Sequence, residues 1–181
     1  MIRTLLDRLY LGAGFLAGGF LVAVFVLMMA LSVGRPIGIN IPAGDDIVAW
    51  CMVATSFLGL AHTFRAGEMI RVGLLIDVIE GRKRHWIEVG ALIIGCGFVG
   101  FFAWNAVRMT WDSWRFGDMA QGVLAVPLWI PQLGYAAGLV ILLIAFVDEF
   151  FHVVRGNAPR YEKPKPQTAE EVVEQAIQSG V

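Results

Sequence analysis

The chain has 181 residues, of which 57% are hydrophobic and only 16% are charged. A soluble domain of this length cannot bury so much apolar surface, because its interior is too small relative to its surface. The net charge of −1 also excludes the broad basic surface that nucleic-acid-binding proteins use. The composition therefore predicts an integral membrane protein that has no nucleic-acid partner.

Four segments contain no Asp, Glu, Lys or Arg and are long enough to cross the roughly 30 Å hydrocarbon core of a bilayer as helices. Because a bilayer offers the backbone no hydrogen-bond partners, and no strand-like alternation is visible, these segments are expected to be helical. The predicted fold is an all-α integral membrane protein with four transmembrane helices in a membrane domain at 1–152. The spans are expected at about 9–33, 47–64, 89–107 and 128–147.

The first outer loop begins near Arg35 and ends in Asp45 and Asp46, directly before the second span. Acidic side chains in this place can cap free N–H groups and favour the positive end of the helix dipole. They can also contact a partner protein, and the two roles are compatible.

The loop between the second and third spans contains an amphipathic stretch that predicts an interfacial helix at about 69–81. Basic residues and a tryptophan follow it, and we expect them to contact anionic phospholipid headgroups. A basic cluster in this position also serves topology alone, without specific lipid recognition. These interface candidates are Arg82, Lys83, Arg84 and Trp86.

The third helix is expected to continue beyond the membrane. Arg115 lies eight residues after Val107, which corresponds to about 12 Å at the helical rise of about 1.5 Å per residue. Arginine and tryptophan alternate on one face of this helix, a pattern typical of binding hot spots but also of an aromatic belt with snorkelling arginines. The residues of this face are Trp104, Arg108, Trp111 and Arg115.

Two pairs of glycines have the four-residue spacing that permits close approach of membrane helices. Gly14 and Gly18 lie in the first span, and Gly134 and Gly138 lie in the fourth. Glycine is common in membrane helices, so each pair alone is weak evidence. Together the two pairs predict a tightly packed bundle.

The polar end of the chain, residues 153–181, is predicted to be a proline-rich cytoplasmic tail. Thr168 and Glu171 have the spacing of a capping box, which predicts a short helix at about 169–178.

Basic residues are distributed unevenly between the two sides of the predicted membrane. Arg35, Arg108 and Arg115 lie on one side, and the other 11 of the 14 Lys and Arg residues lie on the side of the termini. Because Lys and Arg are enriched in cytoplasmic loops, both termini are predicted to be cytoplasmic. The first span is also too long for a cleaved signal peptide, so we expect a retained anchor.

Residues that could carry out chemistry are scarce in the spans. Moving ions or protons within a membrane requires ionisable groups there, and His62 is the only such side chain in the four spans. No nucleophile with a base, phosphate-binding loop or metal-ligand spacing is present, and Cys51 and Cys96 are 45 residues apart. The sequence therefore predicts a protein that is not an enzyme, that carries no cofactor or metal, and that binds other proteins.

Several features follow one another along residues 8–152. They include the acidic pair before the second span, the stretch GLAHTFRAGEMIRV at 59–72, the basic residues at 82–84 and PLWIP at 127–131. Taken in this order, they resemble the DctQ family, the small membrane subunit of tripartite ATP-independent periplasmic (TRAP) transporters. Many relatives have a histidine where this chain has Glu68, so the resemblance assigns no role to this position.

The resemblance implies a complex in the bacterial inner membrane. A periplasmic solute-binding protein would deliver an organic acid, and a large multi-span subunit would carry it inward with sodium ions. The small subunit would pack against the static scaffold of the large subunit and help to receive the binding protein. Its docking face would include Arg35, Asp45, Asp46, Arg108, Trp111 and Arg115.

The residues alone are also compatible with two other functions. One is a membrane redox subunit that binds haem through His62 and His152, because haem between helices needs two axial ligands. The other is a self-sufficient four-helix carrier that acts as a homo-oligomer.

Overall fold

The structure is a computed structural model that describes residues 2–38, 41–66, 82–122 and 124–156. Within these residues the chain forms four long helices, each long and apolar enough to cross a membrane, and one short 3-10 helix. The predicted all-α architecture with four such helices is therefore confirmed. The elements are α1 (Ile2–Gly34), η1 (Arg35–Ile37), α2 (Gly44–Ala66), α4 (Arg82–Phe116) and α5 (Trp129–Val154).

Two further predictions concern parts of the chain that the structure does not describe. The interfacial helix expected at 69–81 and the short helix expected at 169–178 both lie outside the described residues.

The helices are longer than the charge-free stretches from which the spans were predicted. α4 has 35 residues, or about 52 Å at the helical rise, which exceeds a hydrocarbon core of about 30 Å. Because charged side chains are tolerated once a helix reaches the headgroup region, the charge-free length sets only a lower limit on the helix. The predicted continuation of the third helix through Arg115 is confirmed.

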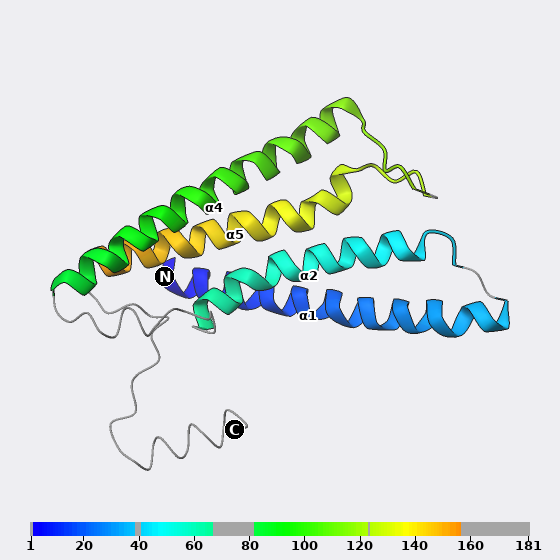
Figure 1. The fold of residues 1–181 in the computed structure, drawn as a ribbon, viewed down its shortest axis with the longest axis horizontal. Helices are drawn as coiled ribbons and strands as arrows, with labels where there is room; N and C mark the ends of the chain where they lie inside the picture. The colour runs from blue at the N-terminus through cyan, green and yellow to red at the C-terminus, as the bar shows by residue number, and fades with distance from the viewer. Residues whose placement is uncertain (1, 39–40, 67–81, 123, 157–181) are drawn as a thin grey trace, which may run out of the picture.

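The helices lie in the spatial order α1, α2, α5, α4 (Figure 1). α2 and α5 occupy the middle, and α1 and α4 lie on opposite flanks. The flanking helices consequently expose many large apolar side chains, such as Phe15 on α1 at 74% and Ile94 on α4 at 75%. In a bilayer these surfaces can contact only lipid or another membrane protein.

Small side chains dominate the interior where the helices meet. Ala54, Ala61, Ala103 and Ala136 are all buried, and such residues let helix backbones approach closely. Larger rings fill the space nearer the ends of the contacts: Phe64 of α2 stacks on Phe146 of α5 with ring centroids 4.2 Å apart.

The connection from α4 to α5 is compact. Gly117 ends α4 in a left-handed conformation (φ 67°), which glycine adopts without steric cost. The Leu128 backbone N–H then donates to the Asp118 carbonyl oxygen at 2.9 Å, and the Ala120 N–H donates to the Val126 carbonyl oxygen at 2.8 Å. This pairing holds the start of α5 beside the end of α4.

Candidate functional site

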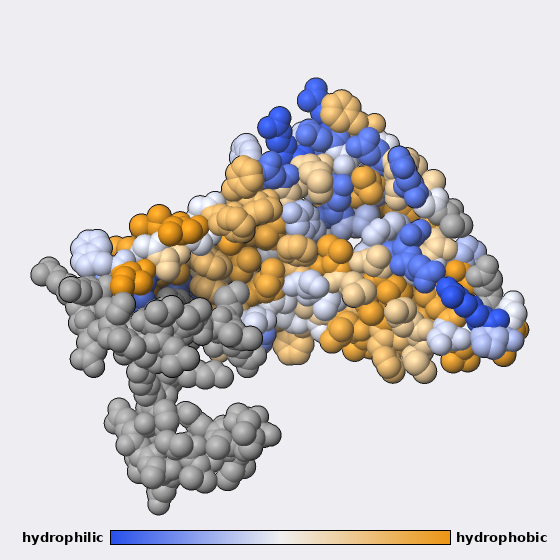
Figure 2. All heavy atoms as spheres, viewed as in Figure 1, coloured by the Kyte–Doolittle hydropathy of each residue, from blue (hydrophilic) through white to orange (hydrophobic). Residues whose placement is uncertain are grey.

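The six residues predicted to form a docking face lie at one end of the molecule. Consecutive helices are antiparallel, so the end of α1, the start of α2, the end of α4 and the start of α5 all lie toward this end, with α4 diverging from α1 and α2 (Figure 1). Hydrophilic residues gather along this end, and hydrophobic residues cover most of the middle of the face in view (Figure 2). We call this end, with Arg35, Asp45, Asp46, Arg108, Trp111 and Arg115, the outer end.

Two of the docking candidates are paired with each other. Arg35 Nη2 donates to Asp45 Oδ2 at 3.3 Å across the loop between α1 and α2, and both side chains are mostly exposed. An exposed pair of this kind contributes about 0–1 kcal/mol, so it orients the loop more than it stabilises the fold. Asp46 lies against the loop before α5, because a Cβ on Gly122 would be only 2.5 Å from its Oδ2 atom.

The remaining candidates lie near the end of α4 and are exposed. Arg108 Nε is 4.0 Å from Asp112 Oδ2, one helical turn away. Arg115 extends over the ring of Phe116, with its Cζ atom 5.9 Å from the centroid. Trp111 packs beside Trp114, with ring centroids 5.0 Å apart. This part of the outer end therefore combines accessible cations with aromatic rings.

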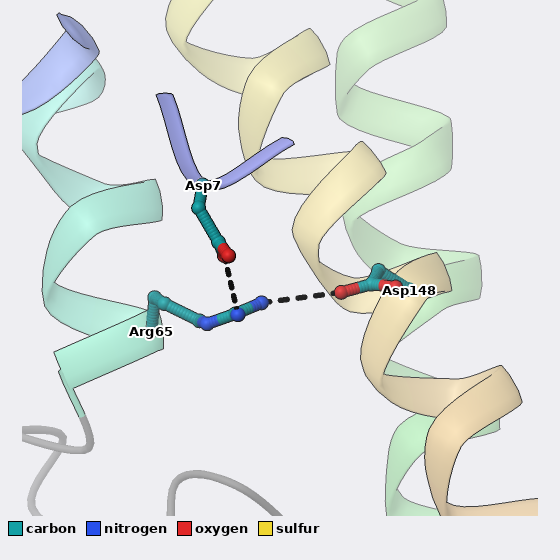
Figure 3. Close-up of polar contacts among 3 residues, drawn as sticks. All are labelled: Asp7, Arg65 and Asp148. Carbon is teal, nitrogen blue, oxygen red and sulfur yellow. Dashed lines mark hydrogen bonds and ion pairs between the residues drawn. The ribbon is translucent and has the colours of Figure 1, made fainter. Parts of the chain in front are cut away.

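At the opposite end, which we call the inner end, a single arginine joins three helices (Figure 3). Arg65, in the last turn of α2, donates from Nη2 to Asp7 of α1 at 2.5 Å and from Nη1 to Asp148 of α5 at 3.2 Å. Its Cζ atom is 5.5 Å from the centroid of the ring of Tyr10, which is buried. A cation at the end of α2 also complements the helix dipole.

This network was not predicted from the sequence. Arg65 was considered only as one of the basic residues that set topology, and the acidic residues on the same side were not considered. The positions of its residues could have revealed the network. Asp7, Arg65 and Asp148 each lie within two residues of a predicted span end, on the same side of the membrane.

The candidates for phospholipid contact lie at the start of α4. The backbone of Arg82, Lys83 and Arg84 forms the first helical turn, but their side chains are outside the described part of the chain. Trp86 is 66% exposed and therefore accessible to the surrounding medium.

The four glycines predicted to pack helices have different surroundings. A Cβ on Gly14 would be 2.9 Å from the His62 ring, and one on Gly134 would be 2.8 Å from Ala54. A Cβ on Gly138 would be 2.6 Å from the carbonyl oxygen of Phe57. Gly18 has no described atom within 4 Å of this position. Three of the four glycines thus lie at contacts between helices.

Comparison with known protein families gives a match over most of the chain. Residues 9–156 match the family described as "Tripartite ATP-independent periplasmic transporters, DctQ component". No curated protein matches the sequence. The matched segment begins within the first turns of α1 and ends two residues after α5, so it includes the outer end and most of the inner end.

Proposed function

This multi-span membrane protein belongs to the DctQ family, the small component of TRAP transporters, and from this premise we propose that it braces the scaffold of the large membrane subunit and helps to dock the periplasmic solute-binding protein. The family is non-catalytic. A component of a tripartite transporter is neither a haem-binding redox subunit nor a carrier that acts alone. The process that it serves would be sodium-coupled uptake of an organic acid across the bacterial inner membrane.

One observation carries the proposal: polar groups are concentrated at the two helix ends. The ion pairs of Arg35, Arg65 and Arg108 all lie there. Transport of a charged solute with sodium requires polar groups at the depth of the membrane. A chain whose middle is apolar supports such transport by holding other subunits in place.

The arrangement of the helices favours a bracing role. α1 and α4 present apolar flanks, and membrane helices associate mainly through van der Waals packing and small residues. A row of four helices with two exposed flanks offers a long surface to a larger membrane protein. The ion pairs of Arg65 hold three of the helices together at the inner end.

The outer end is the proposed docking face. It carries exposed residues of both charges together with Trp111, which is 59% exposed. Charged residues at the rim of an interface mainly increase the association rate and the specificity of binding. The bias in basic residues, with three at the outer end and 11 elsewhere, supports a periplasmic location for this end.

The proposed orientation makes a direct prediction. Green fluorescent protein fused after Val181 should fluoresce, and alkaline phosphatase fused there should be inactive, because the C-terminus is cytoplasmic. The control is alkaline phosphatase inserted after Ala120, in the loop between α4 and α5, which should be active. The opposite pattern of activities would contradict the orientation and, with it, the docking face.

Charge reversal of Arg108 and Arg115 together to glutamate is expected to weaken binding of the solute-binding protein to the assembled transporter about tenfold, or about 1.4 kcal/mol. The reason is the loss of favourable charge at the rim and the introduction of two like charges. Uptake at low concentrations of binding protein should fall in parallel. The measurement is solute uptake into proteoliposomes as a function of binding-protein concentration.

The matched control is Arg155→Glu, which reverses an exposed charge at the inner end. It should leave the concentration dependence unchanged. Wild-type uptake by the double variant, at normal levels of the complex in the membrane, would rule out this part of the docking face.

A further inference from the structure

A groove lies between α4 and α5 in the half of these helices that is nearer the outer end. Its volume is about 440 Å³, and apolar and aromatic side chains form almost all of its walls. The walls include Val107, Trp111 and Trp114 of α4 and Trp129, Leu133 and Val140 of α5.

The length of the groove matches the depth of one leaflet of a bilayer. On α5 the walls extend from Trp129 to Val140, a separation of 11 residues, or about 16 Å at the helical rise. One leaflet contributes half of a hydrocarbon core of about 30 Å. The groove therefore runs from the headgroup region to about the middle of the membrane.

The walls of the groove determine which occupant suits it. They expose almost no polar atoms, so an occupant gains mainly van der Waals contacts along the groove. A hydrocarbon chain of one leaflet supplies such contacts and has no polar groups to satisfy.

The mouth of the groove has the chemistry of a headgroup region. Trp111, Trp114 and Trp129 gather at its outer part, and tryptophan favours this depth because its ring is apolar and its N–H needs a polar partner. Arg115 lies four residues after Trp111, and therefore on the same face of the exposed end of α4. Within the described residues it forms no ion pair, whereas Arg108 lies near Asp112, so Arg115 is available to a phosphate.

We propose that this groove binds one acyl chain of an anionic phospholipid from the leaflet at the outer end, with the phosphate at Arg115. The inference goes beyond docking and bracing, because its ligand is a lipid. Trp111 and Arg115, which also belong to the proposed docking face, lie at the headgroup end of the groove. The bound lipid fills the space between α4 and α5 where their own side chains leave a gap.

The test uses the assembled transporter, purified from membranes that contain phosphatidylglycerol, and native mass spectrometry to count retained phospholipid. Ala137, an exposed residue in the wall of the groove, is replaced by phenylalanine to fill the space. Occupancy by phosphatidylglycerol is expected to fall at least tenfold. The matched control is Ala91→Phe, at an exposed site on α4 outside the groove, and it should retain the lipid.

Equal retention in the wild type and in Ala137→Phe would overturn the proposal, as would equal loss in the Ala91→Phe control.

A second measurement does not require that a variant with a filled groove folds correctly. A photoreactive phenylalanine analogue at Leu133 should cross-link to phospholipid in irradiated membranes, and cross-linking to another polypeptide would overturn the proposal. Arg115→Gln should lower the preference for phosphatidylglycerol over phosphatidylcholine several-fold, and an unchanged preference would overturn the assignment of the phosphate to Arg115.

Discussion

Replacement of Gly138 with alanine is expected to destabilise the chain by about 2 kcal/mol, because the new methyl group has no room between α2 and α5. Its position would be 2.6 Å from the carbonyl oxygen of Phe57 and 2.7 Å from the Phe57 Cβ atom. A backbone carbonyl within a helix cannot rotate away, so the two central helices must separate. The expected fall in Tm is about 4–8 °C, measured by thermal unfolding of the purified chain in detergent.

The control for this prediction is Gly97→Ala in the middle of α4. No described atom lies within 4 Å of the position that its Cβ would occupy. Alanine has the higher helix propensity, so this variant should be unchanged or more stable by up to about 1 kcal/mol. If Gly138→Ala is as stable as Gly97→Ala, the close approach of α2 and α5 is not required for stability.

The different surroundings of the glycines show what could not be predicted from the sequence. The pair Gly14 and Gly18 has the same spacing as the pair Gly134 and Gly138, yet Gly18 has open space and Gly138 lies against a backbone. Spacing shows that a helix has a flat strip but does not show which neighbour lies against it. That choice depends on the order of the helices in space.

The positions of the helices could be predicted because they depend on local properties. A charge-free stretch of about 20 residues crosses the membrane whatever its neighbours are. The order α1, α2, α5, α4 could not be predicted in the same way, because the spans are apolar on all sides. An apolar helix in lipid has no hydrophobic face that must turn inward, so small residues and polar contacts decide the packing.

The docking face combines a feature that could be predicted from the sequence with one that could not. Antiparallel helices with a bias in basic residues place Arg35, Arg108 and Arg115 at the same end, and this follows from the sequence alone. Pairing of Arg35 with Asp45 depends on the conformation of the loop between α1 and α2, which no local pattern determines. The contacts of Arg65 were missed for a related reason, because they join residues that are 58 and 83 positions apart.

Replacement of Arg65 with alanine is expected to destabilise the chain by about 1–3 kcal/mol, between the values typical of exposed and of buried ion pairs. The side chains of Arg65 and Asp148 are 26% and 23% exposed, whereas that of Asp7 is 53% exposed. Loss of the guanidinium leaves two carboxylates facing each other at the inner end and removes the cation above Tyr10. The measurement is again the Tm in detergent.

Arg35→Ala is the matched control, because it removes an arginine from an ion pair that is exposed on both sides. This substitution should lower the free energy of unfolding by at most about 1 kcal/mol. Arg65→Lys should be intermediate, because an ammonium group keeps the charge but lacks the planar fork that donates to two carboxylates at once. Equal stability of Arg65→Ala and Arg35→Ala would show that the network does not hold the helices together.

A double-mutant cycle separates a specific contact from a general loss of charge. Arg65→Ala and Asp148→Asn should each destabilise the chain, and the double variant should lose less than the sum of the two single variants. The coupling should be about 1 kcal/mol if α2 and α5 are joined by this pair. If the effects are additive, the contact contributes nothing to stability, and packing contacts such as that of Gly138 against Phe57 hold the two central helices together without it.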